Sequence, residues 1–142
     1  MKLIKHLLDA KGRDVQSIAP DGSVLDAILK MADKGIGALL VIEDGSLAGI
    51  VTERDYARKV ILKGRSSEDT AVRDIMTADV YTANSEDTVQ NCMNMMTDRR
   101  CRHLPVVDDG AINGMISIGD LVKAIIADQK EEIEHLEHYI ST

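Results

Sequence analysis

The sequence of 142 residues contains no tryptophan, no phenylalanine and only three tyrosines. A hydrophobic core must therefore consist of valine, isoleucine, leucine, methionine and alanine, and hydrophobic residues still make up 44% of the chain. Apolar runs recur along the whole sequence, which excludes a disordered chain, because disordered chains have too little apolar surface to bury. The length suits one compact domain or two small halves that share a core.

Cysteine is also scarce, since Cys92 and Cys101 are too few for a disulfide framework in a chain of this size. Neither belongs to a CxxC pair, and no fourth ligand accompanies them and His103, so we predict no metal site. Cys92 lies on an apolar helix stripe and is expected to be buried. Cys101 stands among arginines, which would lower its thiol pKa if it were exposed, so a redox role stays open.

No apolar stretch is long enough for a signal peptide or a membrane span, and we expect a cytoplasmic protein that binds no membrane. Basic residues are in the minority, with 17 Lys and Arg against 24 Asp and Glu and a net charge of -7. This balance argues against a nucleic-acid partner, whose phosphates an acidic chain repels. A single small phosphate ligand is compatible with it, because that ligand needs only one local cationic pocket.

An internal repeat organises the chain. A shift of 65 positions aligns Val15–Ile61 with Val80–Ile126 without a gap. Identical pairs occur throughout the alignment, including Asp44-Gly45 with Asp109-Gly110, which is the strongest local signal for a hairpin turn. An ungapped register through every turn indicates duplication.

Both copies predict the order β-α-β-β-α, because apolar residues at helical spacing are followed by two apolar strands around the acidic-glycine turn. In the first copy the expected elements are a strand at Gln16–Ile18, a helix from Asp21–Ser23 to Gly35, strands at Ala38–Ile42 and Leu47–Val51, and a helix from Glu53. In the second copy they are a strand at Val80–Thr82, a helix from Ser85–Asp87, strands at His103–Val107 and Ile112–Ile116, and a helix from Gly119.

Neither copy is expected to fold alone, because about 47 residues without large aromatics bury too little surface. We predict an α+β fold in which the two repeats pack about a pseudo-twofold axis and leave two related clefts between them. The expected divisions are an N-terminal helix and linker (1–14), the first repeat (15–62), a linker (63–79), the second repeat (80–127) and a C-terminal helix (128–142). That last helix carries a narrow apolar seam, which favours packing on another helix, such as one of a second subunit.

The end of each hairpin carries glycine, two hydrophobic residues, threonine or serine, two further residues and aspartate. The two segments are Gly49-Ile50-Val51-Thr52-Glu53-Arg54-Asp55 and Gly114-Met115-Ile116-Ser117-Ile118-Gly119-Asp120. With Val72-Arg73-Asp74-Ile75-Met76-Thr77 before the second copy and the strand Arg102-His103-Leu104-Pro105-Val106-Val107, this pattern resembles the cystathionine-β-synthase (CBS) domain family.

The resemblance covers nearly the whole chain. Small stand-alone CBS-pair proteins of bacteria and their plant organellar relatives carry similar sequence motifs. It implies a regulatory module and not an enzyme. The module would bind an adenosine nucleotide in the clefts between its repeats and act in trans on an unknown protein target. AMP is the preferred ligand, with ADP, ATP, NAD(H) and S-adenosylmethionine as alternatives. The resemblance also implies a homodimer, and no catalytic cofactor is expected.

The chemistry of the repeated hairpin fits such a ligand. A carboxylate at a helix start can accept two hydrogen bonds from the cis-diol of ribose, which assigns Asp55 and Asp120 to the sugar. Thr52 and Ser117 come three residues earlier, at a strand-to-helix turn where a hydroxyl and free amides favour a phosphate. The structural alternative is that these residues only cap the helix, a role that contributes about 1 kcal/mol. One residue can do both.

Adenine needs apolar walls and backbone hydrogen bonds. The strand edges at Gly37-Ala38 and Val80-Tyr81 are expected to supply them, and Tyr81 is a candidate to stack on the base.

Basic residues are concentrated just before the middle strand of the second copy. We expect Arg99-Arg100 to lie at a helix C-terminus and Arg102 and His103 to reach the phosphate. The first copy has small residues at the equivalent places, where Arg54 could compensate, while its counterpart Gly119 permits close backbone approach. This asymmetry predicts two unequal sites.

Two rival interpretations stay open. The chain could be an interaction module without a physiological ligand, in which case the clefts are only structural. It could also be an enzyme acting on a nucleotide, although the spacing supplies no evident nucleophile, base or metal site.

Overall fold

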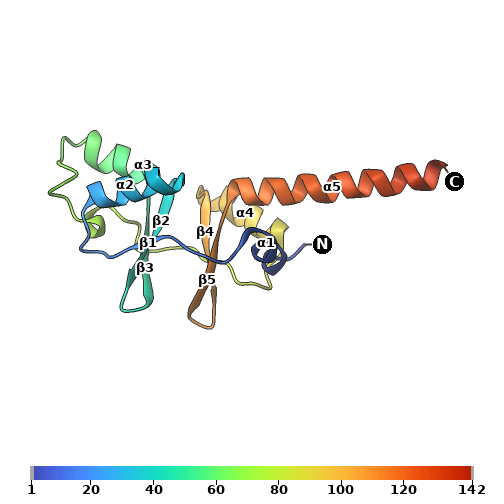
Figure 1. Cartoon of the computed structure of the whole chain (residues 1–142), viewed down its shortest axis with the longest axis horizontal. Coiled ribbons are helices and arrows are strands. Elements are labelled where there is room, and N and C mark those ends of the chain that lie inside the picture. The colour runs from blue at the N-terminus through green and yellow to red at the C-terminus, as the bar shows by residue number, and fades with distance from the viewer. Residues whose placement is uncertain (1, 142) are drawn as a thin grey trace. The chain divides into compact units, whose positions relative to one another are not determined.

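The computed structural model describes residues 2–141 and divides into two compact units (Figure 1). The first-repeat unit comprises residues 14–81 and 109–112. The second-repeat unit comprises residues 1–13, 82–108 and 113–142. Helices and strands alternate in both units, which confirms the α+β class.

The first-repeat unit is built on a three-stranded sheet in the order β1-β2-β3. Its strands are β1 (Ser17–Ile18), β2 (Ala38–Glu43) and β3 (Ser46–Thr52), with β1 parallel and β3 antiparallel to β2. The turn between β2 and β3 has positive φ at Asp44 (52°) and Gly45 (78°). Both residues tolerate this conformation, so the predicted two-residue hairpin turn is confirmed.

Three helical segments accompany this sheet: α2 (Val24–Lys34), α3 (Glu53–Tyr56), which continues into the π-helical η1 (Ala57–Ile61), and the 3-10 helix η2 (Val72–Asp74). Ser23 caps α2, because its Oγ accepts a hydrogen bond from the Asp26 amide at 3.0 Å. Gly35 ends α2 in the left-handed region with φ 65°. Their apolar faces meet the sheet in a core of Val24, Ala27, Met31, Leu39, Val41, Val51, Val60, Val72 and Ile75.

Apart from residues 109–112, the hairpin of β4 (His103–Asp108) and β5 (Ala111–Ser117) belongs to the second-repeat unit. The helices of this unit are α1 (Ile4–Lys11), α4 (Val89–Arg99) and α5 (Ile118–Ser141). Thr88 caps α4, one residue beyond the expected start. The N-terminal helix belongs to this unit because its apolar side is buried in the same core. That core consists of Ile4, Leu7, Leu8, Ala83, Val89, Cys92, Met96, Leu104, Val106, Ile116, Leu121 and Ala124.

The strand predicted at Val80–Thr82 is absent, and a single parallel bridge between Ala83 and Val106 replaces it. The reason lies in one residue. In the first repeat the Leu40 amide donates to the Gln16 carbonyl at 3.1 Å, which extends the pairing. The position equivalent to Leu40 is Pro105, which has no N–H to donate, so the ladder cannot extend toward Tyr81.

The two predicted C-terminal helices form one element. Helix α5 runs for 24 residues without a break, from Ile118 at the end of the hairpin to Ser141. Within residues 2–141, no helix combines the length and apolarity that crossing a bilayer requires.

Candidate functional site

The predicted ribose carboxylate of the first repeat lies at the start of α3. Thr52 and Asp55 form a reciprocal capping box. The Thr52 hydroxyl accepts from the Asp55 amide at 3.2 Å, while Asp55 Oδ2 accepts from the Thr52 amide at 3.0 Å and from the Thr52 hydroxyl at 3.2 Å. Thr52 and Asp55 therefore cap the helix, as their spacing in the sequence allows. The cap fixes the orientation of the Asp55 carboxylate.

Lys59 engages the other oxygen of this carboxylate. Its Nζ lies 3.2 Å from Asp55 Oδ1 and donates to the Ile75 carbonyl at 2.8 Å. The Asp55 side chain is only 13% exposed. Both of its oxygens thus have partners within the first-repeat unit.

The equivalent carboxylate of the second repeat lies at the start of α5. Asp120 Oδ2 accepts from the Ser117 amide at 2.8 Å, and the Ser117 hydroxyl accepts from the Asp120 amide at 3.2 Å. Lys11 of α1 donates to the same Oδ2 at 2.6 Å and to the Met115 carbonyl at 2.7 Å. Both of these contacts with the Asp120 carboxylate are made to Oδ2.

The surroundings keep Asp120 ionised. Burial raises the pKa of this carboxyl, but the hydrogen bonds from Lys11 and Ser117 and the positive charge of Lys11 lower it by more, and the net pKa falls below the ordinary 3.8. A carboxylate that is charged at neutral pH is the acceptor that a ribose diol requires.

Backbone contacts bring the segment before each middle strand against the start of the following helix. The Glu53 amide donates to the Gly37 carbonyl at 3.1 Å, and the Ile118 amide donates to the Arg102 carbonyl at 2.9 Å. The two contacts occupy equivalent positions in the repeats. Gly37 lacks a side chain where one would crowd Glu53, because a Cβ there would lie 2.9 Å from Glu53 Oε1.

The remaining predicted residues take varied positions. Ala38 is buried and pairs with Thr52 in the sheet, whereas Arg54 on α3 and both Arg102 and Gly119 are exposed. His103 is half-buried at the start of β4.

The predicted residues divide between the two units, and a pocket formed jointly by the repeats stays a prediction. The half-buried Val80 and the 43% exposed Tyr81 follow the last helical segment of the first-repeat unit, outside any strand. The first-repeat unit holds Gly37, Ala38, Thr52, Arg54, Asp55, Val80 and Tyr81; the second-repeat unit holds Arg102, His103, Ser117, Gly119 and Asp120.

Sequence reasoning missed both lysines. The contact of Lys59 with Asp55 could have been predicted, because Lys59 follows Asp55 by four residues on a helical segment and such pairs face each other. Lys11 had none, because it is 109 residues from Asp120 in the chain. The position equivalent to Lys59 is Ala124, so the second repeat obtains its lysine from a different helix.

Cys101 does not meet the condition of exposure under which the arginines would lower its pKa. The residue is half-buried, and burial raises its thiol pKa above the ordinary 9.0 despite the neighbouring arginines. Cys92 is fully buried, as predicted, and burial raises its pKa to about 11. Neither thiol is activated as a thiolate at neutral pH.

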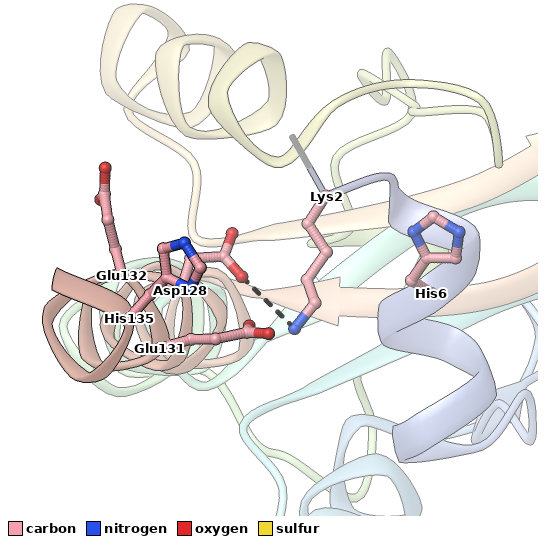
Figure 2. A pocket seen from close by; sticks show the side chains of 6 residues that line it. All are labelled: Lys2, His6, Asp128, Glu131, Glu132 and His135. Carbon is pink, nitrogen blue, oxygen red and sulfur yellow. Dashed lines mark ion pairs between the residues drawn. The ribbon is translucent and has the colours of Figure 1, made fainter. Parts of the chain in front are cut away.

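A separate groove opens between α1 and α5 within the second-repeat unit (Figure 2). It contains none of the predicted nucleotide residues. Lys2 reaches across it to Asp128 at 3.6 Å. In the described residues, no group of three or more His, Cys, Asp or Glu side chains is placed to hold a metal ion. The groove is lined by Lys2, His6, Asp128, Glu131, Glu132 and His135.

The CBS domain family matches residues 9–62 and 72–127. The CBS domain-containing protein CBSX3, mitochondrial, of Arabidopsis thaliana is 42% identical over 96% of this chain and 71% of its own length. A solved protein with CBS domains from Burkholderia ambifaria MC40-6 is 51% identical, with a TM-score of 0.87 over 90% of this chain and 96% of that one.

A third structure shares the fold at low identity. The CBS domain pair of protein MJ0100, solved in complex with 5-methylthioadenosine and S-adenosyl-L-methionine, is 23% identical, with a TM-score of 0.77 over 90% of this chain and 98% of that one. The duplicated hairpin, the two capping-box aspartates and these matches lead to one conclusion: the chain belongs to the CBS domain family and carries two copies of the domain.

Proposed function

We propose that this CBS pair is a regulatory module that binds an adenosine-containing ligand, with AMP as the preferred one, and acts in trans on a protein target. ADP, ATP, NAD(H) and S-adenosylmethionine are the alternative ligands. The MJ0100 pair, which shares this fold, was solved with two adenosine compounds, and that precedent supports the ligand class. The proposal includes a homodimer and a cytoplasmic location.

The state of Asp120 carries the proposal. Its carboxylate is ionised, and the Ser117 amide and the Lys11 ammonium fix its orientation through Oδ2. An oriented anionic acceptor at a helix N-terminus suits a ribose hydroxyl, because the hydrogen bond is charge-assisted and requires little reorganisation.

Positive charge lies beside the same helix start. Lys11 Nζ contacts Asp120 directly, and the Arg102 backbone contacts the first amide of α5. An anionic group of the ligand would meet the ammonium of Lys11 and the guanidinium of Arg102 near the N-terminus of a 24-residue helix, where the helix dipole also favours negative charge.

The first site should be the weaker one. Both oxygens of Asp55 are already engaged, by the capping box and by Lys59. A ribose must compete at Asp55 with partners on both carboxylate oxygens, whereas the contacts of Asp120 described above all engage Oδ2. This contrast supports the unequal sites that the sequence predicts.

Titration calorimetry with AMP tests the proposal, with Asp120→Ala and Asp55→Ala as variants. We expect Asp120→Ala to weaken the tighter binding event by about tenfold or more, because a charge-assisted hydrogen bond is worth about 1.5–3 kcal/mol. Ser23→Ala is the matched control, since it removes the helix cap of α2 outside the predicted site. Wild-type affinity in both aspartate variants would rule out the ribose role.

A thermal-shift screen with AMP, ADP, ATP, NAD(H) and S-adenosylmethionine tests the ligand class. A ligand that binds only the folded state raises the melting temperature by mass action. No shift with any of the five at millimolar concentration would favour the interaction module without a ligand. Two identical, independent AMP sites would contradict the predicted asymmetry.

A further inference from the structure

The second half of α5 buries none of its residues against the described chain. Leu121 and Ala124 are buried in the second-repeat core, but every residue from Gln129 to Ser141 is exposed. Figure 1 shows this half extending past α1 and α4 of the same unit. Most of the stability of a helix in a protein comes from packing of an apolar face, and this half of α5 has no such packing within its own unit.

Five of the exposed apolar residues of α5 lie along one seam. Val122, Ile126, Ile133, Leu136 and Ile140 are 42%, 57%, 54%, 55% and 81% exposed. With Gln129 they follow one another at steps of four, three, four, three and four residues, which is the a/d pattern of a coiled coil. We call these six residues the α5 seam.

We propose that the α5 seam pairs with the α5 seam of a second copy of this chain, with the two helices antiparallel. The inference deepens the homodimer of the proposed function and does not depend on nucleotide binding. The pattern is self-complementary in this orientation, because every a position meets a d position of the other helix. The layers are Val122 with Ile140, Ile126 with Leu136, and Gln129 with Ile133, each formed twice.

The flanking charges select the orientation. In a parallel pair, Glu132 of each copy would face Glu137 of the other, giving two like-charge contacts with no attraction to offset them. In the antiparallel pair, Lys123 of each copy faces Glu137 of the other. Lys130 and Glu132 then each meet their own counterpart at the twofold axis, so two attractive contacts offset two repulsive ones.

The position of charge along the helix gives the same preference. Four glutamates lie between residues 131 and 137, whereas the lysines at 123 and 130 precede them. Antiparallel pairing brings the acidic half of one helix against the more basic half of the other, and it also sets the two helix dipoles in opposition.

Sedimentation velocity of the full chain without nucleotide tests self-association through the seam. We expect a dimer whose dissociation constant rises by roughly tenfold or more in Ile133→Asp, because a charge in an apolar layer is costly. His138→Asp is the matched control, since it adds the same side chain on the far side of the helix and should change the constant little. A monomeric wild-type chain, or equal constants for wild type and Ile133→Asp, would overturn the proposal.

A charge-exchange cycle tests the orientation. For antiparallel helices, Lys123→Glu and Glu137→Lys should each weaken the dimer by about threefold to tenfold, and the double variant should recover most of the loss. For parallel helices, Glu137→Lys alone would tighten the dimer by pairing with Glu132, and that result would overturn the antiparallel arrangement. AMP titration of the same variants separates the two proposals, because nucleotide binding should persist when the seam is broken.

Discussion

Lys11 and Asp120 are joined by a 2.6 Å contact between Nζ and Oδ2, although 109 residues separate them in the chain. The same ammonium donates to the Met115 carbonyl on β5, so one side chain ties α1 to the hairpin and to the start of α5. In the first repeat, Lys59 fulfils the equivalent role on Asp55 from within its own helical segment. Each repeat thus has a lysine on its carboxylate, but from a different element.

Replacement of Lys11 by methionine should destabilise the second-repeat unit. The variant keeps the apolar stem and loses both donated hydrogen bonds, one of them to a charged group. Because Lys11 is 40% exposed, solvent reduces the effect, and we expect a loss of about 1 kcal/mol in the free energy of unfolding. Urea denaturation measures it. Lys63→Met in the exposed linker is the control, and equal losses in the two variants would contradict a specific role for Lys11.

The same variant should change ligand preference. Without Lys11, the negative charge of Asp120 is no longer balanced, so the site should repel a phosphate more strongly. We expect Lys11→Met to lower affinity for AMP more than affinity for adenosine, as measured by calorimetry with both compounds. An equal change for the two would show that Lys11 does not act on the phosphate.

Acid should remove the stabilisation that Asp120 provides. Its pKa in the folded chain lies below the ordinary 3.8, so its contribution is present above that value and is lost as pH falls through the folded-state pKa. Asp120→Asn removes the charge and keeps the shape. We expect wild type to be more stable than Asp120→Asn in urea at about pH 7, with the difference shrinking by about pH 3. A constant difference at the two pH values would contradict this account.

Two equivalent glycines should respond differently to alanine. A Cβ at Gly49 would lie 2.7 Å from the Thr77 carbonyl oxygen, which the Ile50 amide holds at 2.9 Å. A Cβ at Gly114 would lie 2.7 Å from Cδ2 of Leu8, the far end of a side chain. We expect Gly49→Ala to lower the free energy of unfolding by about 2 kcal/mol or more and Gly114→Ala by about 1 kcal/mol. The backbone at Thr77 can move less than the end of the Leu8 side chain. The urea midpoints of the two variants test this order, and a larger loss in Gly114→Ala would contradict it.

Arg100→Gly should stabilise the chain. Arg100 ends α4 with φ 54°, a left-handed conformation that costs a residue with a Cβ about 1–2 kcal/mol. The equivalent residue of the first repeat is Gly35, which adopts the same conformation at φ 65°. Glycine loses more conformational entropy on folding, which offsets part of this gain. We therefore expect the free energy of unfolding to rise by about 0.5–1 kcal/mol. Arg99→Gly removes the same charge inside the helix and should destabilise; a loss in both variants would contradict the argument.

Much of the architecture is local and could be predicted. The acidic-glycine turns at Asp44-Gly45 and Asp109-Gly110 adopt the positive φ values that two-residue hairpins need. The spacing of Thr52 and Asp55 produces the expected cap, and the repeat register places an equivalent cap at Ser117 and Asp120. These features depend on residues a few positions apart, which is why a single sequence contains their signal.

Two features could not be predicted from the repeat pattern and the local charge alone. The repeat register predicted a strand at Val80–Thr82, yet Pro105 on the neighbouring strand lacks the N–H that would extend it. The arginines beside Cys101 would lower its thiol pKa only if the side chain were exposed, and its partial burial raises the pKa instead. Both outcomes depend on residues that are close in space but distant in the sequence, so the local pattern does not predict them.

The sequence by itself determined the duplication, the turns, the helix caps and the two aspartates at equivalent helix starts, because all of these follow from short-range geometry and a constant register. Only the tertiary structure decided that α1 packs into the second-repeat core and that Lys11 contacts Asp120. An ion pair across 109 residues has no sequence signature, since it depends on how apolar faces pack and not on any spacing along the chain.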